Sequence, residues 1–369
     1  IAVGMSTSIP THNLGEVVDL VKAFIDKPDM PLEEMMELMP GPDFPTGGII
    51  ANKKDLPAIY ETGVGKIKLR GKIEVELGRR KADRDKLVIS EIPYTMIGAG
   101  INKFLVDIAE LVENKTLSDV VDISNQSSKE GIRIVLELKK DADIEKIRNI
   151  LYKKTKLEDT FGVNMLAIAH GRPETLNLRG ILQNYLEFQY ENTTHKYQAL
   201  LEKELEKKEI REGLIRACDV IDLIIAILRG SKNLKDAKAC LMNGDISKIQ
   251  FKHPGFEEDA KQLNFTEKQA NAILEMRLYK LIGLEILALQ KEYKECLKRI
   301  AEYEKVLKSR DGMNKVIKED LDHIKEEFAE PRKTLIENGK EAVYEESAAA
   351  VAEIVFVMDR FGYCKLLDR

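Results

Sequence analysis

The spacing of apolar side chains divides the chain into a first part with mixed periodicities and a second part with helical spacing. In the first part, residues 66–73 alternate between basic positions and apolar or glycine positions, which predicts a β-strand. The apolar runs at 87–89 and 132–138 predict two more strands. Apolar residues recur at helical spacing over 101–112 and 141–151, so two amphipathic helices are expected beside these strands.

In the second part, charged and helix-favouring residues replace most of the glycine and proline. Apolar positions follow alternating steps of four and three residues over 210–228 and again over 289–307, which is typical of a coiled coil. Between these two series, residues 266–269 read Thr-Glu-Lys-Gln, the sequence of a capping box. We expect this box to open a helix over 267–282 that stops at Gly283.

These patterns predict an α+β protein in which a mixed α/β domain precedes a long antiparallel coiled coil that carries a helical domain at its far end. A hairpin cannot hold a core alone, so the apolar run near residue 354 is interpreted as the start of a truncated C-terminal β domain. The expected boundaries, in chain order, are 1–175 for the α/β domain, 176–212 for the outgoing arm, 213–285 for the helical domain, 286–330 for the returning arm, 331–352 for a linker and 353–369 for the opening strands of the β domain.

Composition narrows the classes of function. The net charge is −5, which by itself argues against nucleic-acid binding, but basic residues outnumber acidic ones over 66–86. The 4 cysteines are widely spaced and fit neither a zinc site nor a disulfide framework, so we expect free thiols in a reducing cytoplasm and no metal site. No apolar run reaches the roughly 20 residues that cross a bilayer, and no signal peptide is recognisable, so no membrane partner is expected.

Sequence signatures of catalysis are absent from the chain. There is no glycine-rich phosphate loop, no nucleophile elbow and no His-Glu-x-x-His motif. Residues 63–65, Gly-Val-Gly, are too short for a phosphate loop and are not followed by the required helix pattern. A stand-alone enzyme would need a catalytic cluster that the sequence does not provide.

Residues 4–14, Gly-Met-Ser-Thr-Ser-Ile-Pro-Thr-His-Asn-Leu, place an isoleucine beside a rigid proline among small polar side chains. One interpretation is structural: Asn13 caps a helix over 14–25, and Ile9 fills a core. The other is functional: Ile9 acts as an apolar wedge between base pairs, while the small polar residues around it hold phosphates. The composition of the segment alone favours the structural interpretation.

This segment, extended to Glu16, closely resembles the stretch that follows the DNA-cleaving domain in the A subunits of DNA gyrase and topoisomerase IV, the bacterial type IIA topoisomerases. Further segments resemble landmarks of the same family in the same order along the chain. They are 40–47, 91–94 and 161–165, which are similar to its tower domain, and 266–285, which is similar to its carboxy-terminal gate. Separated motifs in one order are far more specific than any single motif.

The resemblance implies that the first domain is the family's tower and that Ile9 intercalates into the bent DNA. It also implies that the residues beside Ile9 contact the DNA; these are Ser6, Thr7, Ser8, Pro10 and His12. The basic positions of the alternating strand share one face and would suit phosphate contacts; these are Lys66, Lys68, Arg70 and Lys72. A solvated outer face of the sheet explains the same four positions equally well.

The helical second part is similar to the coiled-coil arms of the family and to the exit gate at their end. The resemblance implies a homodimer closed through this gate, and the residues expected to contact the second copy are Arg277, Leu278 and Leu281. In the first arm the family is usually more basic than residues 193–195, Thr-Thr-His, which argues against a DNA-lining role there. A structural coiled-coil dimeriser without a DNA role is the alternative, and it leaves Ile9 and the basic strand unexplained.

The family's DNA-cleaving tyrosine follows an arginine, whereas none of the 11 tyrosines here does. We therefore expect that tyrosine to lie upstream of Ile1 and this chain to be inactive alone. The resemblance implies an ATP-dependent topoisomerase in the bacterial cytoplasm, at the nucleoid, which passes one duplex through a transient break in another. The expected partners are double-stranded DNA and a B subunit that holds magnesium and ATP, so no cofactor is expected in this chain. Gyrase and topoisomerase IV fit these motifs equally.

Overall fold

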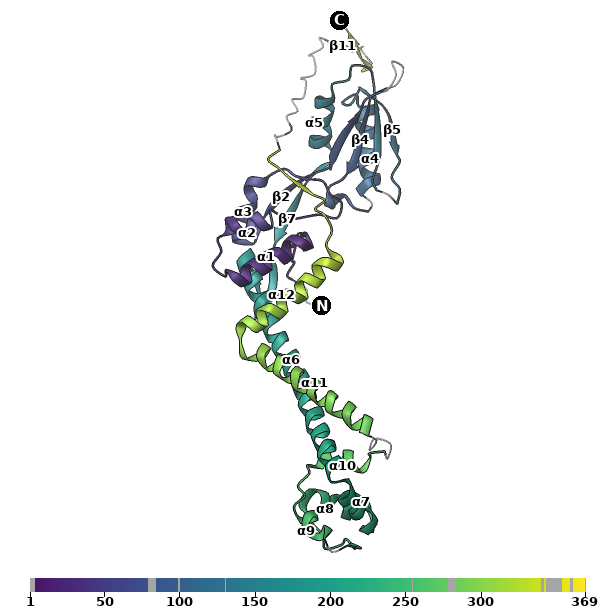
Figure 1. The fold of residues 1–369 in the computed structure, drawn as a ribbon. Helices are drawn as coiled ribbons and strands as arrows, with labels where there is room; N and C mark the ends of the chain where they lie inside the picture. Colours follow the sequence, from purple (N-terminus) through teal and green to yellow (C-terminus); the bar gives the residue numbers. More distant parts are fainter. Residues whose placement is uncertain are drawn as a thin grey trace. The chain divides into compact units, whose positions relative to one another are not determined.

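The structure is a computed structural model, and it describes residues 4–78, 84–98, 100–129, 131–253, 255–277, 283–339, 342, 354–358 and 361–368. The chain forms two compact units, which can be followed by colour in Figure 1. The first comprises Ile1–Leu20, Asp29–Ile181 and Ala329–Arg369, and the second comprises Val21–Pro28 and Leu182–Phe328. Among the described residues every strand lies in the first unit, and the second unit is helical, which confirms the predicted α+β class.

A four-stranded sheet in the first unit carries the N-terminal segment. Its order is β10-β1-β2-β7, with β1 and β10 parallel; the strands are β1 (Ile49–Ile50), β2 (Val64–Arg70), β7 (Glu158–Asn164) and β10 (Leu335–Ile336). The helices nearby in sequence are α1 (Leu14–Asp26), α2 (Leu32–Leu38), η1 (Lys53–Asp55) and α3 (Leu56–Thr62). The predicted linker over 331–352 is wrong in its first part, because β10 completes this sheet beside β1.

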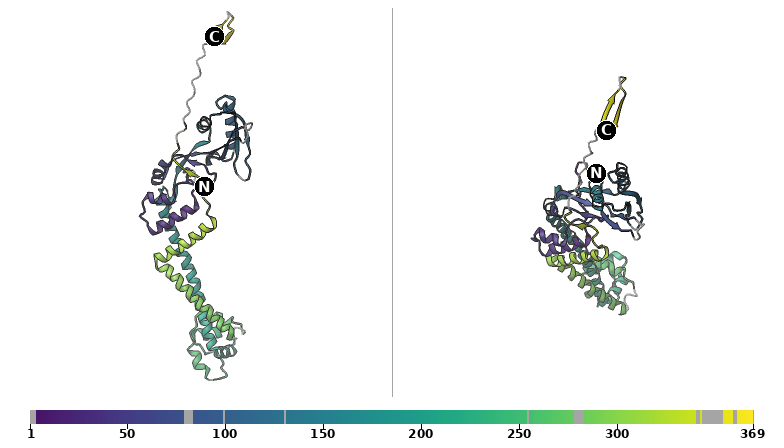
Figure 2. Two further views of the ribbon diagram at one scale, coloured as in Figure 1. Left: turned by 45° about the horizontal axis from the view of Figure 1, so that its top comes forward. Right: turned by 90° about the horizontal axis from the view of Figure 1, so that it is seen from above.

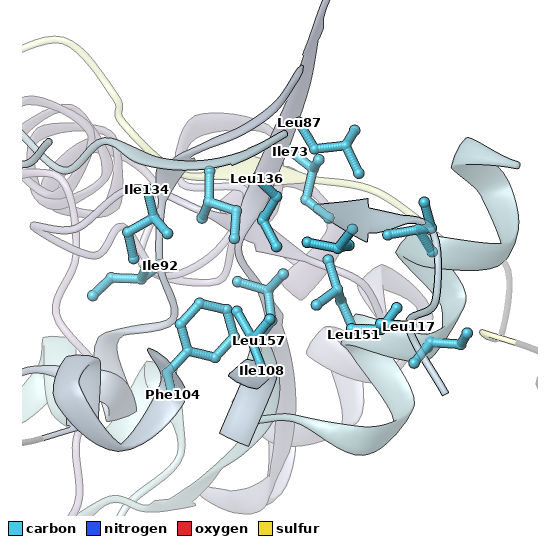
Figure 3. Close-up of a cluster of buried hydrophobic side chains, with 14 of the residues drawn as sticks. Ile73, Leu87, Ile92, Phe104, Ile108, Leu117, Ile134, Leu136, Leu151 and Leu157 are labelled. Atoms are coloured by element: carbon cyan, nitrogen blue, oxygen red, sulfur yellow. The ribbon is translucent and has the colours of Figure 1, made fainter. Parts of the chain in front are cut away.

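A second four-stranded sheet in the same unit is antiparallel throughout and has the order β3-β4-β6-β5. Its strands are β3 (Lys72–Glu76), β4 (Lys86–Glu91), β5 (Val120–Asn125) and β6 (Ile134–Leu138), and its helices are α4 (Gly100–Glu113) and α5 (Ile144–Lys154). Alternate strand residues meet the helices in an apolar core, where Leu87, Phe104 and Leu136 are at most 1% exposed (Figure 3). The predicted strands and helices of this region are confirmed; α5 begins at Ile144 because Asp143 caps it.

The alternating stretch 66–73 is not one strand, and that prediction is wrong. The chain passes from β2 to β3, in the other sheet, at Gly71. The Gly71 amide donates to the Leu157 carbonyl at 2.8 Å, and an added Cβ would lie 2.4 Å from Leu157 Cδ1 and 2.7 Å from the Glu91 carbonyl oxygen. Only glycine fits this close approach, so the switch between sheets depends on a contact distant in the sequence.

Shorter elements complete the first unit. They are η2 (Tyr94–Met96) and two antiparallel hairpins, one of β8 (Leu166–Ala169) with β9 (Arg172–Thr175) and one of β11 (Ile354–Met358) with β12 (Cys364–Asp368). The strand predicted near residue 354 is confirmed as β11. Across the described parts of the chain, no helix has both the length and the apolar character needed to cross a membrane.

The second unit contains a pair of long helices. α6 (Leu178–Asp219) lies beside α11 (Gly283–Lys308) in Figures 1 and 2. Arg299 of α11 lies 3.2 Å from the carboxylate of Glu204 on α6, and the rings of Tyr197 and Tyr303 are 5.5 Å apart between centroids. As the residue numbers of these contacts increase along α6, the numbers of their partners decrease along α11, so the two helices are antiparallel. A second returning helix, α12 (Arg310–Phe328), begins after Ser309, so the return is divided in two.

Short helices near the far end of α6 form an apolar core of their own; they are α7 (Ile221–Gly230), α8 (Leu234–Asn243), α9 (Phe256–Lys261) and α10 (Glu267–Leu274). The predicted coiled-coil series over 210–228 is wrong, because α6 ends at Asp219 and α7 begins at Ile221. Residues of that series, such as Ala217 and Ile224, are buried in this core instead. Globular packing, not a coiled-coil seam, therefore explains their spacing.

The capping box at the start of α10 is confirmed. The Gln269 amide donates to the Thr266 hydroxyl at 3.3 Å, and the Thr266 amide donates to the Gln269 side chain at 3.1 Å. The helix itself ends at Leu274, so the predicted span to residue 282 is too long. Gly283 was expected to stop that helix and instead begins α11.

Candidate nucleic-acid interface

The N-terminal segment lies along the edge of the first sheet, at the end of β7. The Ser8 amide donates to the Asn164 carbonyl at 2.9 Å, and the Asn164 amide donates to the Ser8 carbonyl at the same distance. The side-chain amide of Asn164 donates to the Ser6 carbonyl at 2.9 Å, and the Thr7 hydroxyl donates to the Asn164 carbonyl at 3.4 Å. A single residue of the sheet therefore fixes the chain on the N-terminal side of Ile9.

The segment is fixed again on the other side of Ile9. The Thr11 hydroxyl donates to the Asp43 carbonyl at 2.7 Å, and the Asp43 amide donates to the Thr11 carbonyl at 2.8 Å. His12 Nε2 lies 2.8 Å from the hydroxyl of Tyr60, a residue of α3 that is 1% exposed. The loop between the two anchors is therefore short and held at both ends.

Ile9 lies in this loop and is 46% exposed, whereas the neighbouring Pro10 is buried. The interpretation of Ile9 as a core residue is therefore wrong. The predicted helix cap is confirmed, because the side-chain oxygen of Asn13 accepts a hydrogen bond from the Glu16 amide at the start of α1. The fold thus holds in solvent a side chain whose chemistry favours burial.

Burial lowers the pKa of His12 to about 4, so its imidazole is neutral at physiological pH. A backbone hydrogen bond with Pro10 and the charge of Asp43 oppose this shift, and the charge of Arg332 adds to it. A neutral imidazole has one nitrogen that accepts a hydrogen bond, which matches the Tyr60 hydroxyl beside Nε2. His12 in this position supports the loop and presents no positive charge to a phosphate.

Two charged residues brace the base of the segment. The Arg332 guanidinium forms a two-point ion pair with Glu16 and donates to the backbone carbonyls of Gly41 and Pro42. The Asp43 carboxylate accepts hydrogen bonds from the amides of Lys333 and Thr334 and from the side chain of Asn13. Burial raises the pKa of Asp43, but these hydrogen bonds outweigh burial and lower the pKa overall.

The first sheet places two of the predicted basic residues on one face with Ser8. Directly opposite residues of antiparallel strands point to the same face, so Ser8, Asn164 and Val64 share a face. Lys66 and Lys68 follow Val64 at alternate positions of β2, and both are exposed. With strands about 4.8 Å apart and residues about 3.4 Å apart along a strand, Ser8 and Lys66 are separated by about 12 Å. The structure thus brings two predicted motifs together.

Arg70 and Lys72 do not lie exposed on this face with Lys66 and Lys68, so the prediction of four basic side chains on one exposed face is wrong for these two. The Arg70 side chain is 11% exposed, pairs with Glu158 and lies 5.0 Å from the ring centroid of Tyr152. Lys72 belongs to β3 of the other sheet, and its Nζ lies 2.9 Å from Glu74. A hydrogen bond with that carboxylate raises the pKa of Lys72.

The residues that anchor the segment were not identified from the sequence; they are Asp43, Tyr60, Asn164 and Arg332. The stretches 40–47 and 161–165 resemble family landmarks, but no local pattern gives Asp43 or Asn164 a role. The contacts join positions 32 apart for Thr11 with Asp43 and 158 apart for Ser6 with Asn164. Periodicity and capping signals act over a few residues and carry no information about such pairs.

The predicted gate residues are only partly described. Arg277 lies just beyond α10 and is exposed, whereas Leu278 and Leu281 lie outside the described residues. Cys240 and Cys296 are buried free thiols. Within the described ranges, no group of three His, Cys, Asp or Glu side chains could hold a metal ion.

Comparison with known proteins now identifies the class of the chain. A family model that describes the A subunit of DNA gyrase and topoisomerase IV matches residues 1–322, and the chain belongs to this family. It is 40% identical over 368 residues to the DNA gyrase A subunit of Clostridium acetobutylicum, and 36% identical over 366 residues to that of Thermotoga maritima. The alignments cover 100% and 99% of this chain, but 42% of each relative. The resemblance drawn from the motifs is confirmed, and the chain spans about two fifths of the length of these relatives.

Proposed function

We propose that this chain is the DNA-bending and exit-gate part of an ATP-dependent type IIA topoisomerase, which passes one duplex through a transient double-strand break in another. Family membership supports this class of activity. The observation that carries the DNA role is the anchored loop of Ile9, whose apolar side chain is 46% exposed beside a sheet face that presents Lys66 and Lys68. Double-stranded DNA is the partner that matches an apolar wedge flanked by small polar and basic groups.

The free energies of burial and unstacking indicate that insertion of Ile9 alone does not bend the DNA. Burying the exposed half of one isoleucine contributes about 1 kcal/mol. Partial unstacking of a base step costs a few kcal/mol. Phosphate contacts from Ser6, Thr7 and Ser8, and from the two exposed lysines, would supply the balance. We therefore propose that Ile9 makes the kink and the polar face holds the bent duplex, while Pro10 and His12 support the loop from its buried side.

The wedge is tested by Ile9→Ala in the complete A subunit, with bending of a doubly labelled duplex measured by energy transfer. We expect the bent population to fall about fivefold, which corresponds to about 1 kcal/mol. Ile168→Ala is the matched control, because Ile168 of β8 is also apolar and is 80% exposed. Equal bending by the wild type and Ile9→Ala would overturn the DNA role and favour a structural dimeriser without one.

The basic face is tested through the salt dependence of DNA affinity. Replacing Lys66 and Lys68 together with Gln should reduce the slope of log affinity against log salt concentration by about 2, because each phosphate contact contributes about 0.9. Lys72→Gln is the control, since Lys72 belongs to the other sheet and pairs with Glu74. An unchanged slope in the double variant would remove these two lysines from the proposed interface.

We further propose that α6 and α11 form a coiled-coil arm whose end carries a homodimer gate with Arg277, Leu278 and Leu281. The support is the antiparallel pairing of the helices, of which α6 has 42 residues and extends about 63 Å. Light scattering at micromolar concentration tests the gate. We expect a dimer that dissociates when Leu278 and Leu281 are both changed to Glu and persists in Leu205→Glu, an exposed position of α6. A monomer at all concentrations would overturn the gate.

We propose that a partner B subunit holds magnesium and ATP and that this chain alone does not cleave DNA. None of its 11 tyrosines follows an arginine, as the cleaving tyrosine of the family does. Relaxation of supercoiled plasmid is the test, with the chain incubated alone and with the B subunit. Cleavage or relaxation by the chain alone would contradict the proposal. Because DNA is the proposed partner, we propose that the protein acts at the nucleoid of a bacterial cell.

A further inference from the structure

We propose that Asn164 and the His12–Tyr60 pair are positioning residues that hold the Ile9 loop in its inserting shape before DNA binds. The inference rests on the proposed DNA-bending function and adds the residues that make the wedge rigid. Anchors stand on both sides of the loop, so only Ile9 and Pro10 lie between fixed points.

On the N-terminal side, the anchor is the last residue of a paired strand. Asn164 exchanges two backbone hydrogen bonds with Ser8 and holds the Ser6 carbonyl with its side chain, each at 2.9 Å. β7 is paired with β2 along its whole length, from Val64 to Arg70 of β2. Asn164 therefore shares the rigidity of the sheet, and the chain that leads into Ile9 shares it too.

On the C-terminal side, the anchor is a buried hydroxyl group. The ring centroids of Tyr60 and His12 lie 5.9 Å apart, and the hydroxyl lies 2.8 Å from Nε2. The contact joins two side chains, so removal of the hydroxyl leaves the backbone and the buried ring in place. Thr11 keeps its two hydrogen bonds with Asp43 in that variant. Tyr60→Phe thus loosens one anchor without dismantling the loop.

Between the anchors, proline chemistry limits the remaining freedom. The ring of Pro10 holds its own φ at about −65° and disfavours the helical region for Ile9. A loop that is ordered before binding loses less conformational entropy when it binds than a loop that must become ordered. Ile9 in the anchored loop is thereby ready to enter a base step, and loosening either anchor lowers the yield of insertion.

Insertion is measured with 2-aminopurine placed beside the step that Ile9 enters, using the complete A subunit. We expect Tyr60→Phe and Asn164→Ala each to reduce the fluorescence increase on binding about fivefold, the effect of losing one hydrogen bond. The slope of affinity against salt concentration should stay at the wild-type value, because no phosphate contact is removed. If Tyr60 and Asn164 only stabilised the fold, their loss would not lower the fluorescence increase while leaving the salt dependence of the affinity unchanged.

Tyr152→Phe is the matched control. It removes a hydroxyl that donates to the Gly71 carbonyl at 3.1 Å, also in the first unit but in α5. A reduced signal in Tyr60→Phe and Asn164→Ala, with a normal signal in Tyr152→Phe, supports the positioning role. If Tyr60→Phe does not fold, Asn164→Ala decides alone.

The two proposals fail in different ways. Wild-type signals in Tyr60→Phe and Asn164→Ala, together with a lost signal in Ile9→Ala, would overturn the positioning role and leave DNA bending intact. A wild-type signal in Ile9→Ala would overturn the bending function, and the positioning role would fall with it.

Discussion

Ile9 in the first unit is apolar and 46% exposed, whereas Glu204 in the second unit is charged and its side chain is 8% exposed. Each residue occupies the environment that its chemistry disfavours. Glu204 lies on α6 with Lys207 Nζ at 2.6 Å and Arg299 Nε of α11 at 3.2 Å. Ile9 is held in solvent by anchors that involve its neighbours and not its own side chain.

One of these two exceptions is structural, and the proposed function rests on the other. Burial alone raises the pKa of Glu204, but the hydrogen bond from Lys207 and the nearby side chains of Cys296 and Arg299 outweigh burial and lower that pKa to about 2. The carboxylate thus forms ion pairs with Lys207 of its own helix and with Arg299 of α11, and the second pair joins two long helices. The contacts that hold the Ile9 loop leave the Ile9 side chain exposed, as the proposed insertion into DNA requires.

The largest expected effect is on the second unit. Glu204→Ala should destabilise it by about 3 kcal/mol, at the low end for breaking a buried pair because Lys207 and Arg299 are partly exposed. Urea unfolding followed by circular dichroism measures the change. Glu206→Ala is the control, since Glu206 and its partner Lys268 are both exposed and the loss should not be measurable. Equal urea midpoints for Glu204→Ala and Glu206→Ala would show that Glu204 stabilises the fold no more than an exposed charge does.

The next effect concerns the pH dependence of the Ile9 anchors. The folded pKa of His12, about 4, lies below the ordinary 6.5, so the folded state favours the neutral imidazole. Its contribution is therefore fully present above pH 6.5 and is lost as the pH falls toward 4, by about 3 kcal/mol. Unfolding free energies of wild type and His12→Gln, measured from pH 7 to 4, test this. If the unfolding free energies of wild type and His12→Gln change with pH in parallel, groups other than His12 cause the change between pH 7 and 4.

A smaller effect is expected at the start of α1. Asn13→Ala removes the helix cap and two further hydrogen bonds, to Asp43 and to the Glu330 carbonyl. The loss should be about 1 kcal/mol, seen as a lower melting temperature. Asn102→Ala, at an exposed position of α4, should change little. The same melting temperature for both variants would mean that the cap contributes nothing.

The smallest expected effect tests the contrast between Ile9 and Glu204 most directly. Ile9→Ala should lower the unfolding free energy by at most about 1 kcal/mol, because only half of the side chain is buried. Ile67→Ala, at a fully buried position of β2, should lower the unfolding free energy by about 3 kcal/mol. A loss of unfolding free energy close to that of Ile67→Ala would show that Ile9 acts as a core residue, and its contrast with Glu204 would not hold.

Local signals predicted the structure correctly where a few neighbouring residues decide it. Asn13 caps α1, Thr266 and Gln269 form the capping box, and helical spacing located α4. Signals of the same kind misled where distant contacts intervene. The alternation over 66–73 continues through Gly71, but the close approach of Leu157 there sends the chain into another sheet.

The sequence by itself determined the family, the α+β class, the caps and most elements of the second sheet, because motifs, periodicity and caps are written in adjacent residues. The tertiary structure was needed to show that Ile9 is exposed, that Lys66 and Lys68 share a face with Ser8, and that Arg70 and Lys72 pair with Glu158 and Glu74. Exposure and shared faces depend on strand register and on partners more than 100 positions away, such as Asn164 for Ser8. No window along the chain contains that information.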